Sequence, residues 1–578
     1  MTSIHGLGRV VGLVACLAAL AACDSFLEVE QTIQPETGTL FDTDEDFETA
    51  LGSAFGVWWG TAQGSRPTNG VEEWPVLGMA VLADELVMSL TTGTGHAYVA
   101  QEPRIPYDND QFGGNWLFRK PFYDMYQCTS KAIDALAFLN ANPDRRILNE
   151  DGEDVTERSR WFARLMNGMC HVYAGLLFDQ GYTVDETFPT QDKNQEFASL
   201  LRPHWEVTAF GIEQLELAIA EMEAAPDAEI PVTWINRPEN DLVTKDELIR
   251  VAHSMIARAL IYDARHLGQR EAADWDRAVE HIDLGITSDF YVLGLSPRFD
   301  SEYKHWINFQ NDGRISNRIV GPADTTGAYE AWEAAGIDGR EHFLINTPDR
   351  RVHGDSTEDA WAYKVPGAYF QLRYSNCSSS QRTARGETAA QCWNPVNASS
   401  SGGTYRRSLY ASIKWGGSTH WNTGDLVAIS VKEMEFLRAE ALLWAGDSAG
   451  AALIINAQGR EEVGKLPPAT AAGSGTLPSC VPRKLHATVP TCGDIWDVLR
   501  YEKRIETHGT APIISFADWR GWSMMPPGTI CQFAPPYREL ELIGLPYYTF
   551  GGDWPGSVGY PPRENGATCT NPSGPSSP

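Results

Sequence analysis

Apolar residues recur at helical spacing along much of the chain. The first such segment begins with three acidic residues and carries Phe47, Leu51, Phe55 and Trp58 at intervals of three or four positions. This spacing predicts an amphipathic helix, because residues three and four apart lie on the same helix face. The same periodicity predicts further helices at about 116–136, 157–179 and 204–224.

Two later helices are marked by capping sequences as well as by periodicity. Thr244 and Ser430 each stand three residues before a glutamate and open an apolar helical pattern, which is the arrangement of a capping box. A Gly-containing turn and a second helix follow each of them, near Asp274 and after Gly446. A helix, a short turn and a helix with small residues at the crossing is typical of a tetratricopeptide-like unit. We expect about four such pairs, which bury a continuous core by stacking.

The helical period is lost between about 295 and 425 and again after about 522. Both stretches are rich in Gly and in aromatic residues, with short possible strands around 363–372 and 409–414. A long irregular insertion on a helical scaffold is usually functional or disordered, and the many aromatic residues argue against disorder. The predicted fold is therefore all-α, with tetratricopeptide-like helical pairs forming a superhelical scaffold and a large irregular region carrying short strands.

The first residues have the pattern of a bacterial lipoprotein signal. Arg9 precedes an almost wholly apolar run from Val10 to Ala22, which is too short to cross a bilayer. The run ends at Leu20-Ala21-Ala22-Cys23, which resembles a lipobox and implies acylation of Cys23. An ordinary secretory signal with an accidental cysteine is the alternative. No other segment is apolar for long enough to span a membrane as a helix, so attachment through the lipid alone is expected.

The charge balance excludes one class of partner. The chain has 76 Asp and Glu against 46 Lys and Arg, which gives a formal net charge of −30. This excess of acid repels phosphate backbones, so we expect no nucleic acid partner. The 19 Trp are many for such a chain. Most of them belong in a core, but Trp and Tyr also form surfaces for ligands with flat apolar faces.

The cysteines indicate disulfides and not a metal site. Cys16 and Cys23 belong to the signal, and the other eight are an even number in an exported chain. No C-x2-C pair is present, which excludes a zinc ribbon. Cys128 and Cys170 lie in helical patterns and are either bridged or buried thiols. The pairs expected in loops and in the tail are Cys377 with Cys392, Cys480 with Cys492, and Cys531 with Cys569.

One short motif raises the possibility of catalysis. Residues 446–450 fit the G-x-S-x-G pattern of a nucleophile elbow, which needs a strand before the serine and a helix after it. A helical pattern precedes Ser448, so we expect this serine to be a helix N-cap. Pairs of carboxylates carry little weight among 76 acids, and the 13 His show no H-E-x-x-H motif. We expect no catalytic residue, no metal and no cofactor.

Several segments, taken together in their order and spacing, resemble the SusD/RagB family. The helix at 44–59 follows the lipobox and tether as in that family, and the helix at 116–136 has Ser130 where an Asn is usual. The end of the chain departs from the usual Pro-Ile-Pro. The other matching segments are 160–164, 181–184, 348–350, 435–441 with Gly446-Asp447, Ala451-Ala452, Ile455-Asn456 and Arg460, then 500–506 and Asp518-Trp519-Arg520.

The resemblance implies a function and a place in the cell. Such a protein is lipid-anchored in the outer membrane of a Gram-negative-type envelope and faces the cell exterior. It captures oligosaccharide or peptide and delivers it to a TonB-dependent outer-membrane barrel. Two alternatives stay open: a secreted glycan- or peptide-acting hydrolase, and a ligand-free tetratricopeptide-like adaptor.

The resemblance also indicates where a ligand would bind. In the family the ligand face lies in loops after the first helix and in the irregular middle, where a sugar ring can lie flat on Trp or Tyr. For each single candidate, core packing is the competing interpretation. The corresponding stretches hold Trp74, Asp84, His96, Tyr98, Tyr107, Tyr303, Trp306, Arg314 and Trp332.

These inferences divide the chain into three parts. We expect a signal peptide at 1–22, a lipidated tether at 23–42 and a single SusD/RagB-like domain at 43–578. Within that domain we expect a helical scaffold at 43–294 and 426–522, a loop-rich ligand region at 295–425 and an irregular tail at 523–578.

Overall fold

The computed structural model describes residues 41–64, 74–88, 109, 112–188, 197–295, 298–308, 313–335, 339–340, 343–354, 365–372, 408–415, 420–526, 529–546 and 548. The predicted signal peptide and nearly all of the tether lie outside these residues. Across the described ranges, no helix is both long enough and apolar enough to cross a membrane.

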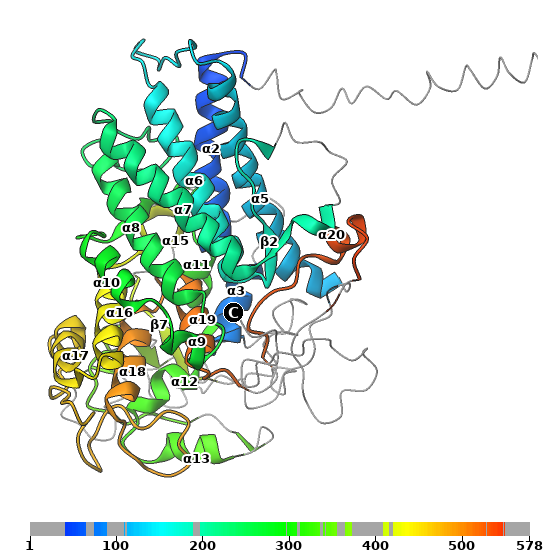
Figure 1. The fold of residues 1–578 in the computed structure, drawn as a ribbon. Helices are drawn as coiled ribbons and strands as arrows, with labels where there is room; N and C mark the ends of the chain where they lie inside the picture. The colour runs from blue at the N-terminus through cyan, green and yellow to red at the C-terminus, as the bar shows by residue number, and fades with distance from the viewer. Residues whose placement is uncertain are drawn as a thin grey trace, which may run out of the picture.

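The long helices of the first half pack against one another in chain order, and Figure 1 shows α2 (Asp44–Gln63), α5 (Phe112–Ala141), α6 (Thr156–Leu177) and α7 (His204–Ala224) side by side. They approach closely: a Cβ on Gly211 would lie 2.7 Å from the backbone nitrogen of Val172 on the neighbouring helix, so this crossing requires glycine. The helices predicted from periodicity are confirmed here. They are α2 (Asp44–Gln63), α5 (Phe112–Ala141), α6 (Thr156–Leu177), α7 (His204–Ala224), α8 (Lys245–Tyr262) and α10 (Trp275–Asp283).

A second group of helices continues the scaffold. The pair α16 (Val431–Trp444) and α17 (Ser448–Ile455) packs with α18 (Ile495–Thr507) around a small core of its own. Helix α10 packs against α16, so the two groups are joined. Helix α19 (Pro512–Gly521) then contacts α8 of the first group. The all-α class with paired helices is therefore confirmed.

Strands are short and lie in antiparallel pairs. The pair β6–β7 falls within the two segments predicted as strands, and Gln371 lies opposite Ala411. Two of the other pairs join distant parts of the chain, since β4 pairs with β8 and β1 with β5. Within the described ranges the pairs are β1 (Leu86–Met88) with β5 (Gly313–Ile315), β2 (Gln180–Tyr182) with β3 (Leu201–Pro203), β4 (Phe290–Leu293) with β8 (Asp425–Ile429), and β6 (Phe370–Leu372) with β7 (Tyr410–Ser412).

Some segments expected to be irregular are helical. No helix was predicted at α3 (Trp74–Leu82), because its residues are apolar on all sides and no polar face marks the helical period. The segments after 295 and after 522 also contain short helices, each too brief to show a period. These are α11 (Glu302–Asn308), α12 (Asn317–Val320), α13 (Ala328–Ala334), α15 (His420–Thr423) and α20 (Tyr537–Leu542), while α9 (Leu267–Glu271) lies between α8 and α10.

Buried ion pairs join α9, which lies between α8 and α10, to the helices of the second group. Arg270 on α9 donates to both carboxylate oxygens of Glu440 at 2.8 Å and to Asp518 at 2.8 Å. Lys503 on α18 donates to the same Asp518 oxygen at 2.8 Å. All four side chains are almost completely excluded from solvent. Segments 435–441, 500–506 and 518–520, which suggested the family resemblance, therefore meet in the interior of the protein.

The predicted capping boxes are half correct. Thr244 and Ser430 do cap α8 and α16, accepting hydrogen bonds from the backbone nitrogens of Glu247 and Glu433 at 3.2 Å. The two glutamate side chains do not return to the caps, because each binds an arginine: Glu247 binds Arg237, and Glu433 binds a buried arginine on α8. A complete capping box, which was not predicted, is formed by Asp494 and Asp497 at the N-terminus of α18.

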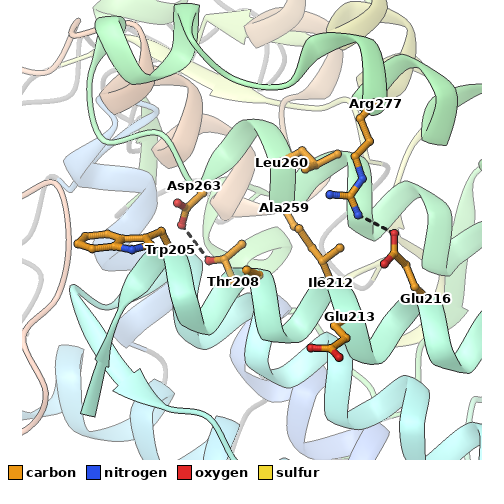
Figure 2. Close-up of a pocket in the computed structure, with 10 residues that line it drawn as sticks. Trp205, Thr208, Ile212, Glu213, Glu216, Ala259, Leu260, Asp263 and Arg277 are labelled. Carbon is orange, nitrogen blue, oxygen red and sulfur yellow. Dashed lines mark hydrogen bonds and ion pairs between the residues drawn. The ribbon is translucent and has the colours of Figure 1, made fainter. Parts of the chain in front are cut away.

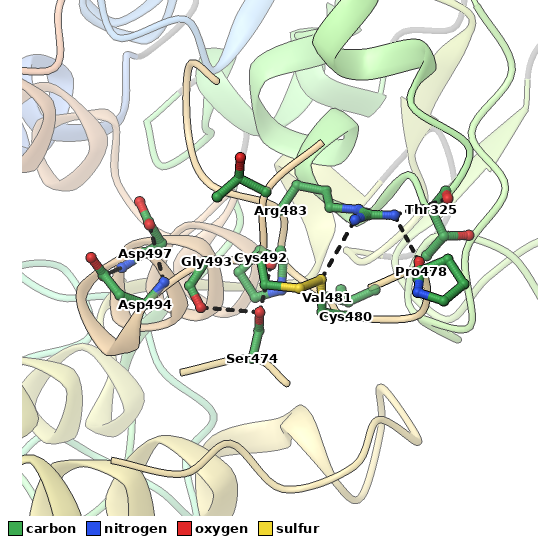
Figure 3. The surroundings of a disulfide bond; sticks show 12 residues. Thr325, Ser474, Pro478, Cys480, Val481, Arg483, Cys492, Gly493, Asp494 and Asp497 are labelled. Atoms are coloured by element: carbon green, nitrogen blue, oxygen red, sulfur yellow. Dashed lines mark hydrogen bonds between the residues drawn. A yellow bond between two sulfur atoms is a disulfide. The ribbon is translucent and has the colours of Figure 1, made fainter. Parts of the chain in front are cut away.

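Two disulfides are described in full. A disulfide between Cys128 and Cys170 joins α5 to α6. Of the two predicted alternatives, the bridge is therefore correct and the pair of buried thiols is not. Cys480 and Cys492 close a loop before α18, in the pairing predicted from the sequence. Figure 3 shows Arg483 beside this second disulfide, where it donates to the carbonyl of Thr325 at 2.9 Å and so holds the loop to the segment before α13. Cys531 is also disulfide-bonded, whereas Cys377, Cys392 and Cys569 lie outside the described residues.

Candidate functional site

The structure brings several of the predicted ligand residues into one region. The β1–β5 pair places Val87 opposite Arg314, and α11, which carries Tyr303 and Trp306, packs against α3 and β5. Segments more than 200 residues apart therefore meet. The side chain of Trp74, at the start of α3, and the whole of His96, Tyr98 and Tyr107 lie outside the described residues.

Asp84 and Trp332 meet at a buried arginine. Asp84 accepts a hydrogen bond from Arg318 at 2.8 Å. The guanidinium carbons of Arg318 and Arg340 lie 5.6 and 4.4 Å from the centroid of the Trp332 ring. Glu333 pairs with both arginines at 3.2 Å. Burial alone would raise the pKa of Glu333, but the charge of Arg318 holds that pKa well below its ordinary value. Asp84 and Trp332 are 7% and 8% exposed, so most of each side chain already contacts protein.

Tyr303 and Arg314 are buried as well. The Tyr303 hydroxyl donates to Glu85, and the same Glu85 oxygen lies 2.7 Å from Nδ1 of His508. Burial, followed by the charge of Glu85, raises the pKa of Tyr303 well above its ordinary value. The contacts of Glu85 with Tyr303 and His508 connect α11 to the turn between α18 and α19. Arg314 on β5 is also enclosed by protein. Core packing, the competing interpretation, thus describes both side chains.

Trp306 keeps part of its ring accessible, and two aromatic residues missed by the sequence reasoning resemble it in this respect. Trp306, Tyr369 and Trp415 are all half-buried. Trp415 donates from its indole nitrogen to the carbonyl of His508 at 2.8 Å, and its ring lies against Gly509, whose φ of 77° favours glycine. Tyr369 and Trp415 are linked by Lys414, whose Nζ lies 4.7 and 5.3 Å from their ring centroids, and Trp306 shares α11 with Lys304, which lies over Trp415. We call Trp306, Tyr369 and Trp415 the aromatic cluster.

Two lysines lie against the aromatic cluster. The Nζ atom of Lys304 is 4.9 Å from the centroid of the Trp415 ring, and that of Lys414 is 4.7 Å from the centroid of the Tyr369 ring. Burial lowers the pKa of Lys304 to about 7 and that of Lys414 to about 8. Tyr369 lies within the first predicted strand and Trp415 directly follows the second, which was the available signal, but nothing in the sequence placed those strands beside α11.

Comparison with known proteins identifies the architecture. No family model matches the sequence, and no curated protein matches it. Solved structures do match. A SusD homolog from Parabacteroides distasonis aligns at a TM-score of 0.51 with 14% identity, covering 82% of this chain and 84% of that one. A SusD superfamily protein from the same species also aligns at 0.51, with 10% identity, covering 87% of this chain and 98% of that one. The chain has the SusD-like fold.

Within this SusD-like fold, Ser448 does not occupy a nucleophile elbow. Helix α16 precedes it, and Ser448 is the first residue of α17. The N-cap is Asp447, whose side chain accepts a hydrogen bond from the backbone nitrogen of Gly450 at 2.8 Å. The prediction that Ser448 caps the helix is therefore wrong by one residue. The carboxylate of Asp447 takes the capping role because it reaches the free amide groups of the first turn.

Proposed function

We propose that this protein binds an oligosaccharide or peptide nutrient without chemically changing it and delivers it to a TonB-dependent outer-membrane barrel. The observation that carries the proposal is the SusD-like fold, which spans 82–87% of the chain in the two alignments at a TM-score of 0.51. The aromatic cluster supports it, because half-buried Trp and Tyr rings offer flat surfaces for sugar rings or apolar side chains.

The proposal places the protein on the membrane through a lipid at Cys23. In that case Cys23→Ser should leave the membrane fraction and appear as soluble protein, because several acyl chains are lost together. Cys16→Ser lies in the same apolar run and serves as a matched control that should stay bound to membranes. The measurement is fractionation of cells that express each variant. Detergent-dependent membrane binding of Cys23→Ser equal to that of the parent protein contradicts the anchor.

The ligand face is tested by calorimetry against a panel of oligosaccharides and peptides. A few stacked rings and polar contacts give an expected Kd on the order of micromolar to millimolar. Removing one stacked ring loses about 0.5 to 1.5 kcal/mol, so Trp306→Ala or Trp415→Ala should weaken binding roughly two- to tenfold. Trp496→Ala is the control, since Trp496 is half-buried on α18 against Trp444.

The possible results separate the function from its site. Circular dichroism of each variant should match the parent protein, because the three tryptophans are only partly in the core. If the parent protein binds nothing in the panel, the ligand-free adaptor replaces the proposed function. If it binds but neither Trp306→Ala nor Trp415→Ala weakens binding, the function stands and the aromatic cluster is not its site. Release of cleaved products from the panel would instead support the hydrolase.

A further inference from the structure

Two histidines on neighbouring helices of the scaffold face each other. His253 lies on α8 and His281 on α10, and their Nδ1 atoms are 2.9 Å apart. The centroids of the two rings are 5.1 Å apart. At this distance one Nδ1 donates a proton and the other accepts it. We call these two residues the histidine pair. Its two Nδ1 atoms are directed to the same place between the helices.

The backbone holds the histidine pair together. Helix α10 packs against α8, and the turn after α10 is bonded to α8, because the backbone nitrogen of Ile286 donates to Oγ of Ser254 at 3.0 Å. Ser254 directly follows His253 in the chain. A Cβ on Gly285 would lie 2.6 Å from the same Oγ, so this close approach favours glycine. The fold thus brings the two rings together in advance, which lowers the cost of ordering a binding site.

Both rings can offer a lone pair at Nδ1. Burial lowers the pKa of His253 to about 4 and also lowers the pKa of His281, so both imidazoles are neutral near pH 7. A neutral imidazole has one nitrogen free to bind a metal ion. Neither Nε2 atom has a hydrogen bond with a residue that the structure describes. The proton between the rings can therefore move to Nε2 of its own ring, which frees both Nδ1 atoms with no net loss of a proton.

The charges around the histidine pair favour a cation. The carboxylates of Glu216 and Glu223 on α7 stabilise positive charge at His253. Arg277 on α10 opposes positive charge at His281, but its guanidinium is paired with Glu216 at 2.6 Å (Figure 2). Across the described ranges, no group of three or more His, Cys, Asp or Glu side chains is placed to hold a metal ion. A metal ion here has two imidazole ligands from the protein and takes water at its other positions.

The distance between the two nitrogens indicates which ions fit. Two metal–nitrogen bonds of about 2.0 to 2.1 Å span about 2.9 Å at a right angle and about 3.3 to 3.4 Å at a tetrahedral angle. The observed 2.9 Å matches adjacent positions of a tetragonal site, the geometry of Cu²⁺ and Ni²⁺ with nitrogen and oxygen ligands. Only the planes of the rings have to turn. His281 is half-buried in the last turn of α10, so its ring is the one that turns.

We propose that His253 and His281 together bind one divalent transition-metal ion, Cu²⁺ most tightly and Ni²⁺ next. No metal was expected from the sequence, because two histidines 28 residues apart match no ligand spacing. The ion joins α8 to α10, so its binding stabilises the folded scaffold. This site goes beyond the proposed function and does not depend on it.

The test uses the full-length folded protein without a histidine tag, after removal of metal by a chelator and of the chelator by dialysis. Calorimetry should show one Cu²⁺ per chain bound with a Kd on the order of micromolar, weaker binding of Ni²⁺, and no binding of Mg²⁺ or Ca²⁺. His253→Gln and His281→Gln should each weaken Cu²⁺ binding at least about tenfold, since even loss of a residue that only supports a ligand costs that much. His266→Gln removes a half-buried histidine between α8 and α10 and is the matched control, with an expected change below about twofold.

Two further measurements separate a lost ligand from a lost fold. Circular dichroism of the metal-free variants should match that of the parent protein, because glutamine is polar and similar in size to histidine. Excess Ni²⁺ should raise the melting temperature of the parent protein and of His266→Gln, but not that of His253→Gln or His281→Gln. Electron paramagnetic resonance of bound Cu²⁺ should show two imidazole nitrogens in the parent protein and one in either variant. If one variant does not fold, the other gives the result alone.

Other results overturn the inference. It is lost if the parent protein binds neither Cu²⁺ nor Ni²⁺, if both ligand variants bind Cu²⁺ as the parent protein does, or if His266→Gln weakens binding as much as they do. Equal affinity for Mg²⁺ and Cu²⁺ would indicate oxygen ligands and overturn the histidine pair. Failure here is distinguishable from failure of the proposed function, because Trp306→Ala should leave Cu²⁺ binding unchanged and a chelator should leave nutrient binding unchanged.

Discussion

Arg258 and Glu433 bind each other through two hydrogen bonds in the protein interior, from Nε to Oε1 at 2.7 Å and from Nη2 to Oε2 at 2.5 Å. Neither side chain has any exposed surface. The pair joins α8 to α16, which lie 175 residues apart in the chain. Tyr262 adds a hydrogen bond to the same carboxylate at 2.9 Å. A buried ion pair thus holds the two helical groups together, and each of its charges is compensated by the other.

Removing one member of this pair should be severely destabilising. Glu433→Ala leaves the Arg258 guanidinium buried without its carboxylate, which should cost about 3 to 5 kcal/mol of unfolding free energy. Changing both residues, Arg258→Met with Glu433→Leu, should cost less than the single change, because no charge is left uncompensated. Urea unfolding measures each value. The exposed pair Arg202–Glu206 is the control, where Arg202→Ala should cost at most about 1 kcal/mol. A loss at Glu433→Ala as small as that of the control would contradict this account.

The start of α17 gives a second prediction. Asp447→Ala removes the side chain that accepts the hydrogen bond from Gly450, so stability should fall by about 1 kcal/mol. Ser448→Ala should change stability by only a few tenths of a kcal/mol, because alanine is favourable in the first helical turn. Unfolding midpoints of the two variants under identical conditions make the comparison.

Labelling of Ser448 tests whether the protein is catalytic. A serine-directed fluorophosphonate should not label Ser448, since a helix and not a strand precedes it. Labelling that disappears in Ser448→Ala but persists in Asp447→Ala would show a reactive serine and would overturn the non-catalytic function.

The burial of His171 gives a prediction of how the stability of the protein depends on pH. Its Nδ1 lies 2.9 Å from the carbonyl of Asn167, and its Nε2 accepts a hydrogen bond from the backbone nitrogen of Val184 at 3.2 Å. The ring is therefore neutral, with its proton on Nδ1. Burial lowers its pKa from 6.5 to about 4.

Because the folded protein binds this proton less tightly than the unfolded chain, stability is fully present above about pH 6.5 and is lost as pH falls through 4. The loss from this group should reach about 3 kcal/mol at low pH. His171→Gln carries no titrating group, so its stability should fall less between pH 7 and pH 4 than that of the parent protein. Unfolding free energies at several pH values test this, and equal acid sensitivity of the two proteins would disprove the assignment.

The scaffold could be predicted from the sequence because its signals are local. The spacing of Phe47, Leu51 and Phe55 and the caps Thr244 and Ser430 each act within one or two turns, and they fixed the helices correctly. The partners of the acidic residues could not be predicted in this way. Glu433 fits a capping box as well as it fits a buried ion pair, and the choice depends on an arginine 175 residues away.

The candidate site was harder to predict, because exposure depends on contacts between distant segments. Tyr303 and Trp306 stand three residues apart in the same short helix, yet one is fully buried and the other half-buried.

The two described disulfides should differ in accessibility. Cys128 and Cys170 are both completely buried between α5 and α6, whereas Cys492 is partly exposed in its loop. Because thiol–disulfide exchange requires access to a sulfur atom, mild reductant should open Cys480–Cys492 in the folded protein and leave Cys128–Cys170 intact. Alkylation and mass spectrometry at intervals after addition of reductant identify which cysteines become modified first.

The two disulfides should also contribute differently to stability. The less accessible one, Cys128–Cys170, should contribute more. The bridges close loops of 42 and 12 residues. A longer loop restricts the unfolded chain more, so the chain-entropy relation gives about 4 kcal/mol for Cys128–Cys170 and about 3 kcal/mol for Cys480–Cys492. The double variants Cys128→Ala with Cys170→Ala and Cys480→Ala with Cys492→Ala should show this order in urea unfolding. The cavity left by two buried sulfur atoms enlarges the first loss further. If the short loop proves the costlier to open, its main role is native-state contact with Arg483, which binds the loop through Cys480 and the carbonyl of Pro478.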